Sequence, residues 1–175
     1  MAGGCALTSG YVLDCRDGIG GIKEVYLIET NNISAITEVS GVVTAITKDV
    51  GKRFYKYSLI RETSNFDETI TGNEQNGTIF YAQSLQIIIN KKQTAVRNEV
   101  LLLARNNITA VVVDNNGTAW LAGRELGLVL NGGTASSGTA WADRNGYTLP
   151  FTGNERELAP EVTAGIISTL ETPGV

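Results

Sequence analysis

Histidine is absent from this 175-residue chain, and its absence excludes several functional classes. Without histidine there is no Ser-His or Cys-His catalysis, and the commonest transition-metal ligand and the physiological-pH switch are missing as well. The two cysteines, Cys5 and Cys15, lack the CxxC spacing of a zinc site. A disulfide between them and two free thiols both remain open. The sequence therefore predicts no catalytic, cofactor-binding or metal-binding residues.

The chain also lacks a basic patch and a long apolar run. Lys and Arg number 14 against 18 Asp and Glu, which gives a net charge of −4. A protein that binds nucleic acid through its phosphates normally has a basic face, so the charge argues against tight DNA binding, although DNA could pass close by. No window approaches the ~18 apolar residues of a membrane span. The N-terminus does not read as a signal peptide, and we expect no membrane anchor.

Prolines number only 3 against 20 glycines, a ratio typical of a β-rich chain with many turns that need positive φ. With 42% hydrophobic residues the chain can build a normal core. We expect an irregular N-terminal arm over residues 1–21 and a single mainly-β domain over residues 22–175. The run Gly18–Gly21 lacks the Lys-Ser/Thr of a phosphate-binding loop, and a flexible turn explains it.

Alternating apolar residues and turn signals predict a series of strands. A break at Ser40-Gly41 divides the second, and Asn-Gly turns stand at 116–117 and 145–146. Asp114–Gly117 lacks the acidic series and closing Glu of a calcium loop, so we interpret it as a hairpin turn. The expected strands are residues 22–29, 33–47, 53–61, 78–90, 108–113, 118–122, 126–130, 140–143, 147–152 and 162–170.

One helix is predicted, over about residues 94–106. Thr94 can cap it, and apolar residues recur at helical spacing from Val96 to Ala104. Leu101 and Leu102 widen the apolar stripe, so we expect the helix to lie deep against a sheet. The fold class predicted is thus a β-sandwich or barrel with one packed α-helix.

Residues 62–77 are polar and end in Asn-Gly, which predicts a polar hairpin projecting from the domain. Projecting loops often carry contacts while the scaffold holds them in place. The alternative is a solvated loop with its Phe folded back onto the core. If the hairpin carries contacts between subunits, the candidate residues are Asn65, Phe66, Asp67, Ile70 and Asn73.

Catalysis would require paired carboxylates, and the candidate pairs are Asp14 with Asp17 and Asp67 with Glu68. All four lie in polar or glycine-rich segments, where a solvated surface carboxylate is the ordinary state. We therefore do not expect an enzyme. The two tryptophans, Trp120 and Trp141, could stack on sugars in a carbohydrate-binding β-sandwich, although burial or subunit packing explains them equally well.

Three longer stretches complete a pattern with the polar segment 62–77. They are GTIFYAQSLQIIIN…VRNEVLLLARNN (77–107), VVVDNNGTAWLAGRELGLVL (111–130) and SGTAWADRNGYTLPFTGNERELAPEV (137–162). Together they resemble the tail tube proteins of tailed bacteriophages. The resemblance implies hexameric rings in which strands join across subunits, stacking into a tube through the arm and the polar hairpin.

The same resemblance implies a location in the virion tail, with assembly in the host cytoplasm and other phage tail proteins as partners. DNA would pass through a smooth, neutral or acidic lumen without specific binding. Other small phage structural proteins share related β folds, and the alternatives are a tail terminator, a neck or connector protein and a capsid decoration protein. The carbohydrate-binding β-sandwich remains the alternative from a different class.

Overall fold

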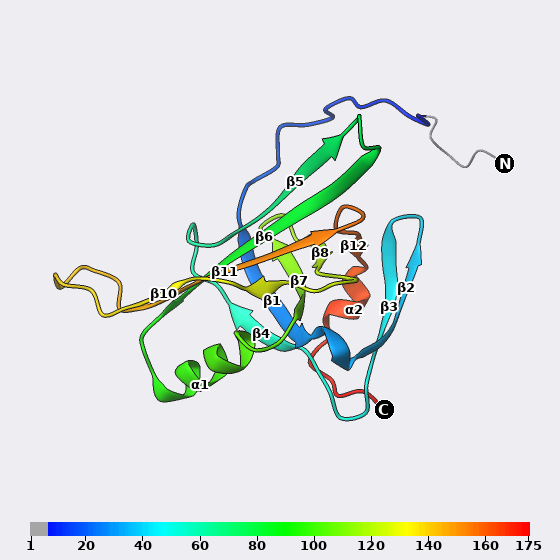
Figure 1. Ribbon diagram of the computed structural model, residues 1–175. Coiled ribbons are helices and arrows are strands. Elements are labelled where there is room, and N and C mark those ends of the chain that lie inside the picture. The colour runs from blue at the N-terminus through cyan, green and yellow to red at the C-terminus, as the bar shows by residue number, and fades with distance from the viewer. Residues whose placement is uncertain (1–6) are drawn as a thin grey trace.

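The computed structural model describes residues 7–175 and shows a mainly-β fold of two packed sheets with one longer helix at the edge (Figure 1). The predicted fold class is confirmed. Strands form at 22–29 and 78–90 with the bounds expected from their patterns. The predicted break at Ser40-Gly41 is a tight turn in which both residues have positive φ, 53° and 82°.

The larger sheet has seven strands in the order β2-β3-β12-β8-β7-β1-β4. Every neighbouring pair is antiparallel except β12 with β3. A short 3-10 turn, Thr30–Asn32, joins the first two strands of the chain. The strands are β1 (Ile22–Glu29), β2 (Ile33–Val39), β3 (Val42–Lys48), β4 (Tyr55–Ser58), β7 (Ile108–Asp114), β8 (Ala119–Ala122) and β12 (Glu161–Val162).

The smaller sheet has five strands, four of them in the order β10-β11-β6-β5, and β9 also pairs with β11. All of its pairings are antiparallel. Its strands are β5 (Asn65–Asn73), β6 (Thr78–Asn90), β9 (Val129–Leu130), β10 (Thr134–Ser136) and β11 (Gly146–Glu155).

Two hydrophobic cores lie on opposite faces of the seven-stranded sheet. Alternate residues of β7 enter one or the other, so Ala110 and Val112 pack between the two sheets while Val111 and Val113 pack on the far side. The strand is buried on both faces and therefore lacks polar alternation. Leu85, Ile87 and Phe151 from the smaller sheet complete the core between the sheets.

The predicted strand at 162–170 is wrong. Only β12 is extended there, and the chain continues as a short helix, α2 (Ala164–Ile167), followed by turns. Ile166 and Ile167 both pack against the second core, which adjacent residues of a strand could not do. The Nζ of Lys48 donates hydrogen bonds to the carbonyls of Thr169, Leu170 and Thr172 at 2.7, 3.1 and 2.6 Å, so this side of the large sheet is closed by the chain itself.

The helix α1 (Thr94–Leu103) is shorter and more peripheral than predicted. Its N-cap is Gln93, which makes no side-chain capping bond, so the assignment of Thr94 as the cap is wrong. Of its residues only Leu103 is buried, while Leu101 and Leu102 remain exposed. The wide apolar stripe therefore does not place the helix deep against a sheet.

The predicted hairpin between residues 140–143 and 147–152 does not form. Residues 140–143 are turns, and β11 pairs instead with β10 and β6. Strand β11 begins at Gly146, where a Cβ would lie 2.1 Å from the carbonyl oxygen of Ile89, so only glycine permits this close approach. The strands predicted at 53–61 and 126–130 are shorter, Tyr55–Ser58 and Val129–Leu130.

Candidate assembly surface

Residues 62–77, predicted as a polar hairpin, contain a nine-residue edge strand. Strand β5 pairs with β6 along its whole length, from Asn65 opposite Gln86 to Asn73 opposite Thr78. The turn after it is closed by a hydrogen bond from the Asn76 amide to the Asn73 side-chain oxygen at 3.0 Å. The polar composition that suggested a loop arises because one face of β5 is exposed throughout.

The five predicted contact residues are divided between two faces of β5. The face turned away from the large sheet carries Asn65, Asp67 and Asn73. On this face the side-chain amide of Asn65 donates a hydrogen bond to the Asp67 carboxylate. Phe66 and Ile70 lie on the opposite face. Phe66 packs against the core, whereas Ile70 is 60% exposed.

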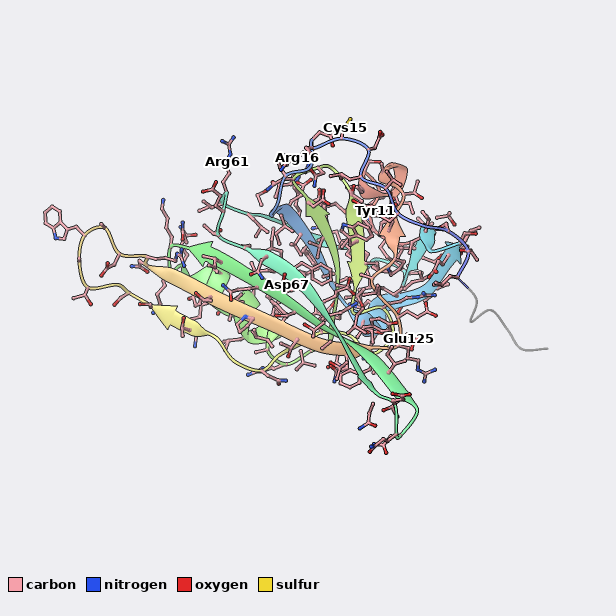
Figure 2. The ribbon with its side chains drawn as sticks, turned by 90° about the horizontal axis from the view of Figure 1, so that it is seen from above. Tyr11, Cys15, Arg16, Arg61, Asp67 and Glu125 are labelled. Atoms are coloured by element: carbon pink, nitrogen blue, oxygen red, sulfur yellow. The ribbon has the colours of Figure 1, made fainter. Side chains whose placement is uncertain are left out.

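The outward face of the β10-β11-β6-β5 sheet, which we term the outer face, is polar and almost uncharged. The register places the odd-numbered residues of β5 beside the even-numbered residues of β6, β11 and β10 on this face. Asp67 is the one charged side chain among these strand residues, and Figure 2 shows it midway along the sheet. Phe80 is also exposed there, at 39%, and the remaining exposed side chains are hydroxyls and amides: Asn65, Thr69, Thr71, Asn73, Thr78, Ser84, Asn90, Thr134, Ser136, Thr152 and Asn154.

The inward face of the β5–β6 hairpin stays apolar beyond the point where the body ends. Ile70 lies opposite Tyr81, and Ile79 lies opposite Gly72. Both isoleucines are 60% exposed, and every residue from 69 to 80 is exposed. We term residues 70–81 the hairpin tip, and Figure 1 shows the hairpin reaching past the other strands of its sheet. Apolar residues aligned on a projecting hairpin are typical of a contact surface.

A buried polar cluster fixes the direction in which the hairpin points. The Glu68 carboxylate accepts hydrogen bonds from the Gln83 side chain at 2.9 Å and from the Ala159 amide at 2.8 Å. The Gln83 oxygen in turn accepts from the Gly123 amide at 2.8 Å. Sequence reasoning missed this cluster. Its signal is a Gln at an inward position of β6, between Tyr81 and Leu85 in an otherwise apolar series.

Among residues 7–175, β5 and β10 are the outermost strands of the smaller sheet and neither pairs with a further strand, although Ile19–Gly21 of the arm line a pocket together with Asn65–Asp67. Because the four strands alternate in direction, β5 and β10 run in opposite directions. A copy of the chain related by rotation about an axis would therefore bring its β10 antiparallel to β5 of the first copy. The sheet can thus continue from one copy to the next without a change in strand alternation.

The arm, residues 7–21, is extended and exposed, and its last residues are fixed to the β7–β8 turn. Asn116 exchanges two hydrogen bonds with the backbone of Ile19, at 2.9 and 2.8 Å, and the Asn115 side chain donates to the Gly20 carbonyl at 2.7 Å. The Asp114 carboxylate accepts from two amides within the turn, which confirms its interpretation as turn chemistry. Figure 2 shows Tyr11, Cys15 and Arg16 along the arm, and Cys5 lies outside the described residues.

The candidate carboxylates and tryptophans do not come together in one site. Asp67 and Glu68 point to opposite faces of β5, and Asp14 and Asp17 lie exposed in the arm. Trp120 is half-buried, with its Nε1 3.4 Å from the Asp114 carboxylate, and the other tryptophan is fully exposed in the β10–β11 loop. Within residues 7–175, no group of three His, Cys, Asp or Glu side chains could hold a metal ion. No helix in this range is long and apolar enough to cross a membrane.

Comparison of the chain with protein-family models, with curated proteins and with solved structures gives no match.

Proposed function

We propose that the protein is a virion structural protein, the tail tube subunit of a tailed bacteriophage. The observation that carries the proposal is the smaller sheet, which combines an uncovered neutral face with two free edges of opposite direction. Exposed edges aggregate unless they are paired or covered, and closing a sheet on itself removes them. Copies joined through β5 and β10 would form one closed barrel, the hexameric ring that the resemblance implies.

In this barrel the outer face of the sheet becomes the wall of the lumen, and the seven-stranded sheet lies outside it. Each copy then contributes hydroxyls, amides, the Phe80 ring and the single Asp67 carboxylate to the lumen. A neutral to weakly acidic wall does not neutralise phosphates, so DNA passes without the salt-dependent grip of a basic channel. Passing DNA is thus a partner without a binding site, and the proposal includes no catalytic or cofactor role.

Stacking of rings is assigned to the hairpin tip and the arm. The tip carries Ile70 and Ile79 on a rigid two-stranded support, and the arm carries exposed Tyr11 and Val12. Burial of these side chains against the next ring would supply apolar contact area that an isolated subunit leaves in water. Other tail proteins would limit the length of the tube.

Negative-stain microscopy and native mass measurement of the purified protein test the proposal. The expected result is hexameric rings that stack into tubes as concentration rises. Closed rings or trimers that never polymerise would favour a connector, a tail terminator or a capsid decoration protein. A strictly monomeric protein at high concentration would contradict all of these structural roles.

The carbohydrate-binding alternative depends on tryptophan, and the structure offers one exposed indole, that of Trp141. Trp120 is half-buried beside Asp114, so the two do not present a shared stacking platform. Quenching of tryptophan fluorescence by oligosaccharides would support this alternative. The absence of a response across a glycan panel would leave subunit packing as the role of the indole.

A further inference from the structure

The loop of residues 137–145 joins β10 to β11 and projects from the end of the sheet (Figure 1), and it carries Trp141. Trp141 is fully exposed, an unusual state for the side chain with the largest apolar area. The loop is internally braced, because Asp143 accepts hydrogen bonds from the amides of Ala140 and Thr139 at 2.7 and 2.9 Å. These bonds hold the pKa of Asp143 below its usual value. The indole is therefore held outward by an ordered turn, which lowers the entropy cost of a contact.

A hollow groove lies between α1 and the sheets. Two adjoining cavities of about 370 and 160 Å³ share the side chains of Tyr57, Glu99 and Leu103. Both cavities open to solvent, so a side chain from another copy can enter them. We term this space the helix groove, and its larger cavity is also lined by Ile89, Val96 and Val100.

The tryptophan loop and the helix groove lie at the same end of the smaller sheet. The register places Ser136, Gly146 and Asn90 side by side, so β10 enters the loop at the level where β6 leads into α1. Copies in a ring are related by rotation, so the loop and the groove lie at the same height along the ring axis in every copy. Beside it, β6 runs past the start of β5 at Asn65, and the hydroxyl of the preceding Ser64 accepts a hydrogen bond from the Ile88 amide at 3.2 Å.

We propose that Trp141 of one subunit inserts into the helix groove of the next subunit around the ring, with Arg144 pairing with Glu99 at its rim. The proposal rests on the ring assembly proposed above. The charges are complementary, because Glu99 lines both cavities while Arg144 follows the indole by three residues in the same loop. The indole and the apolar cavity wall give the contact its buried centre, and the ion pair fixes its register.

The variant Trp141→Ala tests the apolar part. We expect the concentration at which half of the protein is assembled to rise about tenfold or more, the effect typical of an interfacial tryptophan anchor. Leu126→Ala is the matched control, since Leu126 is also an exposed apolar side chain, at 64%, but lines neither cavity. Normal assembly of Trp141→Ala would overturn this inference alone. Failure of the unaltered protein to assemble would overturn the proposed function as well.

Tryptophan fluorescence reports the insertion directly. The chain has two tryptophans, so Trp120→Phe leaves Trp141 as the only emitter. We expect its emission to shift to shorter wavelengths when subunits assemble, because the indole leaves water for the groove. Assembled particles whose Trp141 emission stays at the monomer wavelength would overturn the insertion.

Charge reversal identifies the receiving groove. Glu99→Arg and Arg144→Glu should each weaken assembly, and the double variant should recover most of the loss, because the two charges again have opposite signs. Recovery in the double variant would support the pairing. Additive losses, or no effect of Glu99→Arg, would contradict the assignment of the groove beneath α1.

Discussion

Strands β7 and β6 lie inside their respective sheets, yet their surroundings differ. All of β7 from Ile108 to Val113 is buried, because both faces of its sheet carry a core. In β6 the inward residues Leu85 and Ile87 are fully buried, while Ser84 on the outer face is exposed. The chain itself covers the seven-stranded sheet, including the C-terminal side that Lys48 holds closed.

From this difference we infer where the molecule contacts its neighbours in the proposed assembly. The smaller sheet leaves uncovered one polar face, two edges and the apolar side of the hairpin tip. A sheet that served only its own fold would not need Ile70 and Ile79 beyond the limit of the core. If the account is right, changes to the inner faces should alter folding, and changes to the uncovered features should alter assembly alone.

The largest effect is expected from shortening the hairpin tip. Replacement of residues 71–80 by Asn-Gly joins Ile70 to Tyr81, which already face each other across the pair, through a favoured two-residue turn. Because all the removed residues are exposed, we expect a folded subunit that no longer stacks into tubes. Circular dichroism with negative-stain microscopy measures both properties.

The deletion in the hairpin has to start after Glu68. Deleting all of residues 62–77 would also remove the core contact of Phe66 and the hydrogen bond that the Ala159 amide donates to Glu68. Tubes of normal length from the shortened chain would contradict the role given to the tip. A chain that fails to fold would contradict the separation of tip and core.

A core substitution on the inner face should cost stability. Leu85→Ala removes a fully buried side chain between the sheets and should lower the free energy of unfolding by about 2–5 kcal/mol. Ser84→Ala, one residue away on the outer face, should change it by less than about 0.5 kcal/mol. Urea denaturation of both variants measures the contrast. Equal losses would mean that the outer face is also covered in the isolated subunit.

Charge on the outer face should change how DNA behaves in the tube. Asp67→Lys exchanges the face's single carboxylate for an ammonium in every subunit, which places rings of positive charge along the lumen. We expect assembled tubes of this variant to retain short double-stranded DNA at low salt and to release it as salt rises. Co-sedimentation across a salt series measures this, with Asp67→Asn as the neutral control. Lack of retention by Asp67→Lys would place the outer face elsewhere than the lumen.

The smallest effect concerns pH and the helix groove. Burial, with smaller contributions from Glu99 and Tyr55, raises the pKa of Tyr57 to about 12. The unfolded chain loses this proton near pH 10, so the stability linked to the neutral phenol is fully present below about pH 10 and is lost as pH rises towards 12. Tyr57→Phe should flatten this part of the decline. Urea denaturation at about pH 9 and pH 11 measures the free energy of unfolding of both proteins. An equal loss between the two pH values in both proteins would contradict the raised pKa of Tyr57.

Local patterns predicted much of this fold. The alternation in β6, the apolar run of β7 and the turns at Ser40-Gly41 and Asn116-Gly117 were readable from neighbouring residues. Features decided by distant partners were not. The Ile166-Ile167 pair forms a helical turn because both residues meet the second core, and α1 stays peripheral although its sequence suggests a broad buried stripe.

The contact residues within the predicted hairpin 62–77 stay a prediction. The structure places them on β5, and their division between a neutral face and an apolar face depends on the pairing of β5 with β6. A polar segment of this kind resembles a loop until its partner strand is known, because one of its two faces has no core to contact. The role of Gln83 and Glu68 likewise depends on backbone amides from Gly123 and Ala159, which no local pattern reveals.

The pairing of β5 with β10 of a neighbouring copy is the central claim, and hydrogen exchange tests it most directly. Amides on a free edge exchange rapidly in the isolated subunit and become protected once they join a ladder. We predict that assembly slows exchange in peptides covering residues 65–73 and 134–136, while the already paired β6 changes little. Edge peptides that exchange equally fast in assembled and dissociated protein would contradict the account.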